Sequence, residues 1–234
     1  MPQQIDNIIA LNNHLLERGD YLVQYYRENG QKAVVLKGQS FRPYYPTPYE
    51  RPCGDIDLWV VPAPGVSLHQ HRKQVLNDLR EAGIQYDEVV YHHTHAHFYE
   101  DAEVELHFTP SWMFNPILNH RLQQWFRTQS KHLDYRIYLT IHAFRHLYSS
   151  GIPEKQREDL KHVLTVEGEP DAQTIATLRH LGLRQFYQDF TNWDMPLQKI
   201  RPWSYPRERI WKQPWRVWHF IWRFINGYLI KAKE

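Results

Sequence analysis

The chain has 234 residues, of which 42% are hydrophobic and 23% charged, with a formal net charge of +2. These values are ordinary for a soluble globular protein, and the length allows one large domain or two small ones. The sequence has no charged-then-apolar leader and no long apolar run, and its single cysteine, Cys53, excludes an intramolecular disulfide. We therefore expect a cytoplasmic protein that is neither secreted nor membrane-spanning.

The first predicted elements are a helix and two short strands. Apolar residues recur at helical spacing over 5–29, and Gly30 follows where a C-terminal cap belongs. The β-rich runs 33–37 and 54–62 predict two strands, separated by a loop rich in Pro, Tyr and Gly.

A second helix and two further strands follow in the pattern. Ser67 begins an amphipathic segment that ends at Gly83, which predicts a helix. Segments 86–93 and 94–108 alternate polar and apolar residues, which predicts strands with a tight turn near 100–102.

The rest of the chain has a helical pattern. After Pro116, Gly and Pro residues separate four segments that each predict a helix: 117–128, 134–150, 154–166 and 171–190. A proline-broken connector over 196–214 leads to a last predicted helix, 215–232. The element order predicts an α+β protein, a small mixed β-sheet core with flanking helices followed by an α-helical C-terminal domain. We place an α/β domain at 1–115, a helical domain at 116–195, and a basic, Trp-rich helical extension at 196–234.

One predicted strand carries two carboxylates on a single face. In "CGDIDLWV" (53–60), Asp55 and Asp57 project together, because residues i and i+2 share a strand face. The alternating apolar residues point to the other face, toward the helices: Ile56, Leu58 and Val60. Adjacent carboxylates repel one another, and a hard divalent cation such as Mg²⁺ relieves that repulsion. The alternative interpretation is an ordinary solvated strand face.

Residues near the same strand end suit phosphate binding. Lys37, Gly38 and Ser40 follow the first strand, where an ammonium, backbone amides and a hydroxyl can meet phosphate oxygens. Arg51 precedes the aspartate pair closely enough to reach a bound triphosphate. A surface lysine at a strand end is an equally good interpretation of Lys37.

A later strand offers a third acid. The stretch "EVELH" places Glu103, Glu105 and His107 on one face, and Glu103, nearest the turn, is expected to be exposed. If this strand lies beside the strand of the aspartate pair, Glu105 becomes a third acidic ligand. Three carboxylates from two strands can hold two metal ions, which activate an attacking oxygen and stabilise a leaving pyrophosphate.

These segments resemble a known family. The stretches "LKGQSFRPYYPTPYERPCGDIDLWV" (36–60) and "VELHF" (104–108) are similar to the nucleotidyltransferase superfamily, and within it to the bacterial branch called uncharacterised nucleotidyltransferases. The resemblance continues through "IHAFRHLYSSGIPEKQREDLKHVL" (141–164) and covers residues 30–165. The superfamily has a Gly-Ser or Gly-Gly element, then a D-x-D pair, then a third acid on a later strand.

The resemblance implies both a fold and an activity. It implies a nucleotidyltransferase core that uses Mg²⁺ or Mn²⁺ to transfer a nucleoside monophosphate from an NTP, such as ATP, to an acceptor hydroxyl. Asp55, Asp57 and Glu105 would be the catalytic metal ligands, with Glu105 also assisting deprotonation of the acceptor. Gly38 and Ser40 would form the phosphate-contacting turn. The acceptor stays open between a small molecule, an RNA and a protein.

Three histidines alternate on one predicted strand face. With the tight turn given above, His97 would pair near Glu105 and His95 near His107, while His93 lies further along. Imidazoles that converge with a carboxylate at this spacing suit zinc. We favour the alternative, a polar strand on which His95, His97 and His107 line the nucleotide cleft.

The C-terminal segment is basic and aromatic. From Lys199 onward, nine Lys and Arg residues oppose two Glu, a net charge of +7 that leaves about −5 for the rest of the chain. Five of the nine tryptophans also lie there: Trp203, Trp211, Trp215, Trp218 and Trp222. Apolar residues surround so much of the last predicted helix that we expect it to pack against the helical domain. A protein partner or a membrane surface that contacts residues 199–234 is the alternative.

Two functions of other classes stay open. One is a catalytically silent domain of the same fold that binds a nucleotide or a partner, against which the intact Asp55, Asp57 and Glu105 argue. The other is a nucleic-acid-binding protein led by the basic aromatic tail, whose binding would depend steeply on salt concentration.

Overall fold

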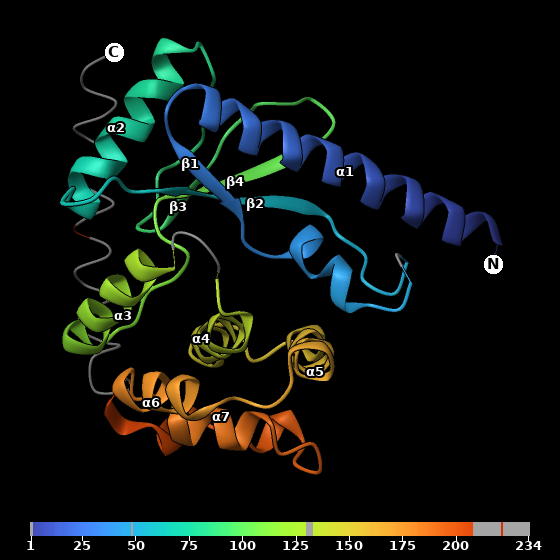
Figure 1. The fold of residues 1–234 in the computed structure, drawn as a ribbon, viewed down its shortest axis with the longest axis vertical. Helices are drawn as coiled ribbons and strands as arrows, with labels where there is room; N and C mark the ends of the chain where they lie inside the picture. Colours follow the sequence, from blue (N-terminus) through green and yellow to red (C-terminus); the bar gives the residue numbers. More distant parts are fainter. Residues whose placement is uncertain (1, 48, 130–132, 208–220, 222–234) are drawn as a thin grey trace. The chain divides into compact units, whose positions relative to one another are not determined.

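The computed structural model describes residues 2–47, 49–129, 133–207 and 221, and the statements below concern these residues alone. They divide into two units, described separately, of which the first takes Met1–Pro110 and the second begins at Ser111 (Figure 1). The predicted domain boundaries stay predictions, and the predicted helix at 215–232 lies outside the described residues. No helix among the described residues has the length and apolar character needed to cross a membrane.

The first unit is built on a mixed sheet of four strands, β1 (Lys32–Val35), β2 (Asp55–Val61), β3 (His93–His95) and β4 (Glu103–His107). The strand order is β1-β2-β4-β3. β1 pairs with β2 and β3 pairs with β4 in antiparallel fashion, whereas β2 and β4 are parallel. The parallel pair is possible because α2 intervenes between the two strands in the chain. The predicted α+β class with a small mixed sheet is confirmed.

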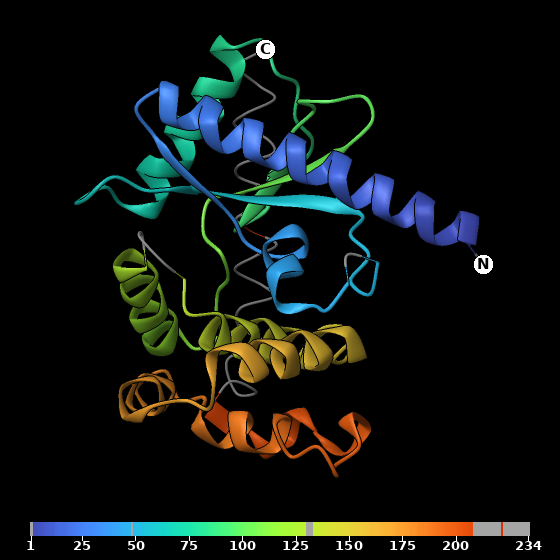
Figure 2. The ribbon, with the colours of Figure 1, turned by 45° about the vertical axis from the view of Figure 1, so that its right-hand side comes forward.

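Two helices, α1 (Pro2–Glu28) and α2 (Leu68–Glu81), cover one face of this sheet (Figure 2). The alternate residues of β2, Ile56, Leu58 and Val60, are buried on that face, as the alternation predicts. They share a core with residues of both helices: Leu15, Leu22, Val75, Leu76 and Leu79. Each fully buried side chain of this size contributes roughly 1.5–3 kcal/mol. This apolar layer therefore fixes the orientation of β2 and leaves its other face for polar residues.

Local signals set the ends of α2. The Ser67 hydroxyl accepts a hydrogen bond from the Gln70 backbone amide, and the side-chain oxygen of Gln70 accepts one from the Ser67 backbone amide. This capping box satisfies donors that the first turn of a helix leaves unpaired. Gly83, just beyond the helix, has φ +71°, a conformation that glycine adopts without steric cost. Both predicted boundaries of this helix are confirmed.

The strands predicted at 86–93 and 94–108 are shorter in the structure, so this prediction is wrong over most of its length. Within residues 86–108, β3 and β4 are the segments that form strands, and Tyr86 and Ala96 add one isolated bridge. Residues 87–92 run beside β3 with scattered hydrogen bonds, such as that from the Asp87 amide to the His95 carbonyl at 2.9 Å. The connection from β3 to β4 covers residues 96–102 instead of a three-residue turn.

The second unit is helical. Its helices are α3 (Pro116–Thr128), α4 (Tyr135–Leu147), α5 (Glu154–Glu167), α6 (Ala172–His180) and α7 (Arg184–Phe190). The prediction of a single helix over 171–190 is wrong, because the helix is interrupted at Gly182, where φ is +73°. A Cβ at this position would also lie 3.2 Å from the side chain of Leu118. Leu181 and Leu183 are buried on either side of the break, so the apolar pattern continues although the helix does not.

Asn12 of α1 holds the segment that enters β2. Its side chain donates to the Arg51 carbonyl at 3.1 Å and accepts from the Cys53 amide at 3.0 Å. Asn12 is buried, whereas its neighbour Asn13 is exposed. We expect Asn12→Ala to lower the free energy of unfolding by about 1–3 kcal/mol, because it leaves a buried amide unsatisfied.

Asn13→Ala is the matched control for this substitution. We expect it to change the free energy of unfolding by less than about 0.5 kcal/mol in urea denaturation. Equal losses in the two variants would contradict the anchoring role of Asn12.

Candidate active site

The parallel pairing of β2 and β4 brings four carboxylates together in two rows. Asp55 lies opposite Glu103, and Asp57 lies opposite Glu105. All four residues share the sheet face that the helices leave uncovered, because the alternate residues of β2 point into the core. The two acidic strands are therefore neighbours, which is the condition on which the role of Glu105 as a third acid depends.

Asp57 is at the centre of this group. Its side chain is 1% exposed, and its Oδ1 lies 2.9 Å from both Lys37 Nζ and His107 Nε2. The other oxygen, Oδ2, is buried and has no hydrogen-bond partner among the described residues. A buried carboxylate oxygen without a partner is costly unless something binds it. One oxygen of Asp57 is thus paired within the protein, and the other has no partner among the described residues.

His107 and Glu105 form the second ion pair of the site. His107 Nε2 lies 3.3 Å from Glu105 Oε2, so His107 faces two carboxylates at once. Burial alone would lower the pKa of His107, but its hydrogen bonds to Asp57 and Glu105 raise it above the ordinary value. Burial opposes ionisation of Glu105, yet the hydrogen bond from His107 and the charge of Lys37 hold the pKa of Glu105 well below its usual range. Glu105 is therefore ionised, and His107 favours its protonated form.

Lys37 supplies the second positive charge. Burial lowers the pKa of Lys37, but the nearby Asp57 carboxylate outweighs that effect, so the pKa is raised overall. The predicted phosphate contact of Lys37 stays a prediction; in the structure its ammonium pairs with Asp57. Two cations and two carboxylates thus balance in this part of the site, and the repulsion between carboxylates is partly relieved by the protein itself.

The segment after β1 begins a short 3-10 helix, Gly38–Tyr44. Gly38 has φ +67°, which favours glycine at this position. Gln39 donates its side-chain amide to the Asp55 carbonyl at 2.9 Å, which ties this turn to the start of β2. The hydroxyl of Ser40 is buried and has no hydrogen-bond partner among the described residues. Arg51 donates to the Pro52 carbonyl at 2.8 Å, and its triphosphate contact stays a prediction.

The predicted register of the histidine strand is wrong. His95 lies opposite Glu105 and His93 opposite His107, where the sequence predicted His97 and His95 at these places. The reason is the longer connection from β3 to β4, which moves the pairing by two residues. A shift of two residues keeps every side chain on its face, so two histidines still point toward Glu105.

His97 lies outside the sheet. Its Nε2 is 3.0 Å from Asp87 Oδ1, and its side chain is 54% exposed. The predicted role of His97 in lining a cleft stays a prediction, and the structure gives it a partner of its own in the loop.

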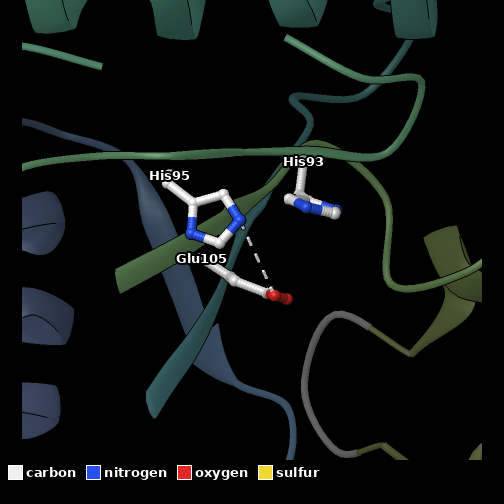
Figure 3. A group of neighbouring side chains, drawn as sticks. All are labelled: His93, His95 and Glu105. Carbon is white, nitrogen blue, oxygen red and sulfur yellow. Dashed lines mark ion pairs between the residues drawn. The ribbon is translucent and has the colours of Figure 1, made fainter. Parts of the chain in front are cut away.

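Two groups of side chains in this region have ligand atoms that lie within 4.8 Å of one another. One group is Asp57, Glu105 and His107, and the other is His93, His95 and Glu105 (Figure 3). Burial and the neighbouring charge of His107 lower the pKa of His93 to about 4, so this imidazole is uncharged at neutral pH. Asp55 belongs to neither group among the described residues, and its predicted role as a metal ligand stays a prediction.

The two carboxylates of the first group, Asp57 and Glu105, fit a magnesium ion. Mg²⁺ prefers carboxylate oxygens, binds one or two of them, and keeps its remaining positions for water and substrate phosphates. The unpartnered Oδ2 of Asp57 and the ionised carboxylate of Glu105 are donors of this kind. These two residues could hold the ion that the sequence predicted.

The sequence did not predict the pairing of Asp57 with its two basic neighbours. His107 follows Glu105 at i+2 on a strand, which places both on one face and could have indicated the contact. The contact of Lys37 with Asp57 depends on where β1 ends relative to Asp57. A single sequence does not show the exact residue at which a strand ends. No sequence pattern indicated the hydrogen bond from the Gln39 side chain to the Asp55 carbonyl.

The match to a family model agrees with this geometry. Residues 3–192 match the model of a family described as uncharacterised nucleotidyltransferase, and the chain belongs to this family. A search of the curated proteins found no match. Membership supports nucleotidyl transfer as the general role and a nucleoside triphosphate and an acceptor as the general substrates.

The ion pairs of His107 predict a pH dependence of stability in the absence of divalent ions. The raised pKa of His107 means that its contribution is complete below about pH 6.5 and is lost as pH rises through the raised value. The lowered pKa of Glu105 means that its contribution is complete above about pH 4.3 and is lost as pH falls. We therefore expect the stability difference between wild type and His107→Gln to be largest between about pH 4.3 and 6.5 and to shrink in alkaline buffer.

Urea denaturation in EDTA at several pH values measures this difference. The exposed residue His97 provides the control, because His97→Gln should change stability little at any pH. A His107→Gln difference that stays constant from acid to alkaline pH would contradict the ion-pair account.

Proposed function

We propose that the protein is a divalent-metal-dependent nucleotidyltransferase that moves a nucleoside monophosphate from an NTP to an acceptor hydroxyl. The observation that carries this proposal is the buried, unpartnered Oδ2 of Asp57 beside the ionised carboxylate of Glu105. Family membership supports the same reaction class. The acceptor can be a small molecule, an RNA or a protein.

The reaction is a substitution at the α-phosphorus. The acceptor oxygen forms a bond to this phosphorus, the bond to the bridging oxygen breaks, and pyrophosphate leaves. Mg²⁺ or Mn²⁺ held by Asp57 and Glu105, with Asp55 beside them, would neutralise triphosphate charge and favour ionisation of the acceptor hydroxyl. Most of the rate enhancement in phosphoryl transfer comes from such positioning and charge stabilisation.

The basic residues of the site bind and orient the triphosphate in this proposal. Lys37 pairs with Asp57 in the ligand-free protein, and a phosphate oxygen placed beside Asp57 would share its ammonium. Ser40 supports the same role, because its buried hydroxyl has no partner among the described residues. Gly38 and Arg51 complete the predicted nucleotide-binding set.

Glu105 serves as a ligand in this proposal, without the role of a general base. Its pKa is held well below the usual range, so it would retain a proton taken from the acceptor only weakly. His107 cannot take that proton while it is protonated between two carboxylates. In this proposal the proton of the acceptor passes to a group outside this ion pair, such as water.

Thermal unfolding with each NTP, with and without Mg²⁺, tests the binding step. We expect one or more NTPs to raise the melting temperature of the wild type only when Mg²⁺ is present, because the ion links the triphosphate to the carboxylates. Asp57→Asn should abolish that shift, since it removes the charge that holds the ion.

Asp20→Asn is the control, because Asp20 is an exposed residue of α1 that belongs to neither candidate ligand group. It should retain the full shift. The metal–nucleotide proposal fails if no NTP shifts the wild type, or if Asp57→Asn shifts as much as Asp20→Asn.

Incubation with α-³²P-labelled NTP separates an enzyme from a silent binding domain. We expect Mg²⁺-dependent release of pyrophosphate together with label transfer to the protein, an RNA fraction or a small-molecule fraction. Binding that produces neither product with any of these acceptors would favour a catalytically silent domain of the same fold.

A further inference from the structure

Two imidazoles and one carboxylate converge at the edge of the sheet formed by β3 and β4. Figure 3 shows the rings of His93 and His95 next to each other, with the carboxylate of Glu105 below both. The ligand atoms of these three side chains lie within 4.8 Å of one another. Magnesium-dependent nucleotidyl transfer as proposed above makes no use of the two histidines, so this arrangement requires its own account.

The His95 ring is oriented as the ring of a metal ligand is. Its Nδ1 lies 2.7 Å from Glu103 Oε1, a contact that holds the ring against β4. The other ring nitrogen, Nε2, faces Glu105. Metal-binding histidines in proteins generally donate their second nitrogen to a carboxylate or carbonyl in this way, which fixes both the tautomer and the ring orientation.

The gap between His95 and Glu105 suits a shared ion better than a hydrogen bond. His95 Nε2 lies 3.9 Å from Glu105 Oε1, which is too long for a hydrogen bond. Nitrogen and oxygen ligands at about 2.0–2.1 Å from a tetrahedral zinc ion are separated by about 3–3.5 Å. A small rotation of either side chain would bring the two atoms to that separation.

His93 offers the third ligand. Its Nδ1 is buried and has no hydrogen-bond partner among the described residues. The ring lies against its neighbours, with centroids 5.4 Å from His95 and 5.3 Å from His107. The backbone pairing of β3 with β4 thus holds both imidazoles beside Glu105.

We propose that His93, His95 and Glu105 form a site for a divalent transition-metal ion of the zinc type, with Glu103 as the residue that positions His95. Two imidazoles and one carboxylate select such ions over Mg²⁺, which prefers oxygen donors throughout. Water or a substrate oxygen fills the remaining position. Glu105 has its Oε2 toward His107 and its Oε1 toward His95, so it can serve this site and the magnesium site together.

Cobalt is the probe for this site, because its visible absorption reports the number and kind of its ligands. Untagged protein is stripped with EDTA, titrated with Co²⁺ without nucleotide, and then titrated with Zn²⁺ in competition. We expect one equivalent of Co²⁺ to give a spectrum distinct from that of the aqueous ion, to be displaced by Zn²⁺, and to be retained in excess Mg²⁺.

Three variants test the ligand His95 and its positioning residue Glu103. His95→Gln should weaken Co²⁺ binding by at least about tenfold, and Glu103→Gln should weaken it by about tenfold, the usual lower limit for loss of a residue that orients a metal ligand. Glu103→Asp should restore part of the affinity. His97→Gln is the matched control, since His97 pairs with Asp87 outside the sheet, and it should bind Co²⁺ as the wild type does.

A spectrum that matches aqueous Co²⁺, or equal affinities in His95→Gln and His97→Gln, would overturn the proposal. Glu103 is exposed, so Glu103→Gln tests the site even if His95→Gln fails to fold. The outcome is independent of the magnesium–nucleotide proposal. That proposal is tested by Asp57→Asn with NTP, whereas this one is tested without nucleotide through His95 of β3 and Glu103 of β4.

Discussion

The parallel pairing of β2 with β4 is the constraint on which the candidate site depends. It sets Asp57 opposite Glu105, and the pleat sends both side chains to the face that the helices leave uncovered. A slip of one residue would send Glu105 into the apolar core, because side chains alternate along a strand. The apolar residues of the other face exclude such a slip, since Ile56 and Leu106 are both fully buried. The hydrophobic core thus specifies the register that brings the acids together.

The charges that follow from this register prepare the site for a ligand. Burial of Asp57 would be costly alone, and Lys37 and His107 offset that cost at one of its oxygens. The second oxygen stays unpartnered among the described residues, beside a Glu105 whose pKa is held low. A divalent ion therefore finds the ionised carboxylate of Glu105 and an unpartnered oxygen of Asp57 already in place. The same Glu105 also faces two histidines, which makes it the residue that two neighbouring sites would share.

Much of the fold and part of the site could be predicted from the sequence. The apolar alternation around Asp55 and Asp57 predicted their common face, and the capping signal at Ser67 predicted the start of α2. The length of the β3–β4 connection was misjudged, because polar loop residues near a strand can continue its alternation. Gly182 ends α6 within an unbroken apolar pattern, since periodicity does not report a positive φ. The contact of Lys37 with Asp57 depends on a strand end, and local patterns do not locate strand ends.

Anomalous diffraction from crystals grown with Mn²⁺ and a non-hydrolysable NTP analogue tests the central claim most directly. The account predicts a manganese peak at about 2.1 Å from Asp57 Oδ2 and from an oxygen of Glu105, with the triphosphate on its other side. A bound analogue with no manganese at these two carboxylates, or with manganese only at His93 and His95, would contradict it.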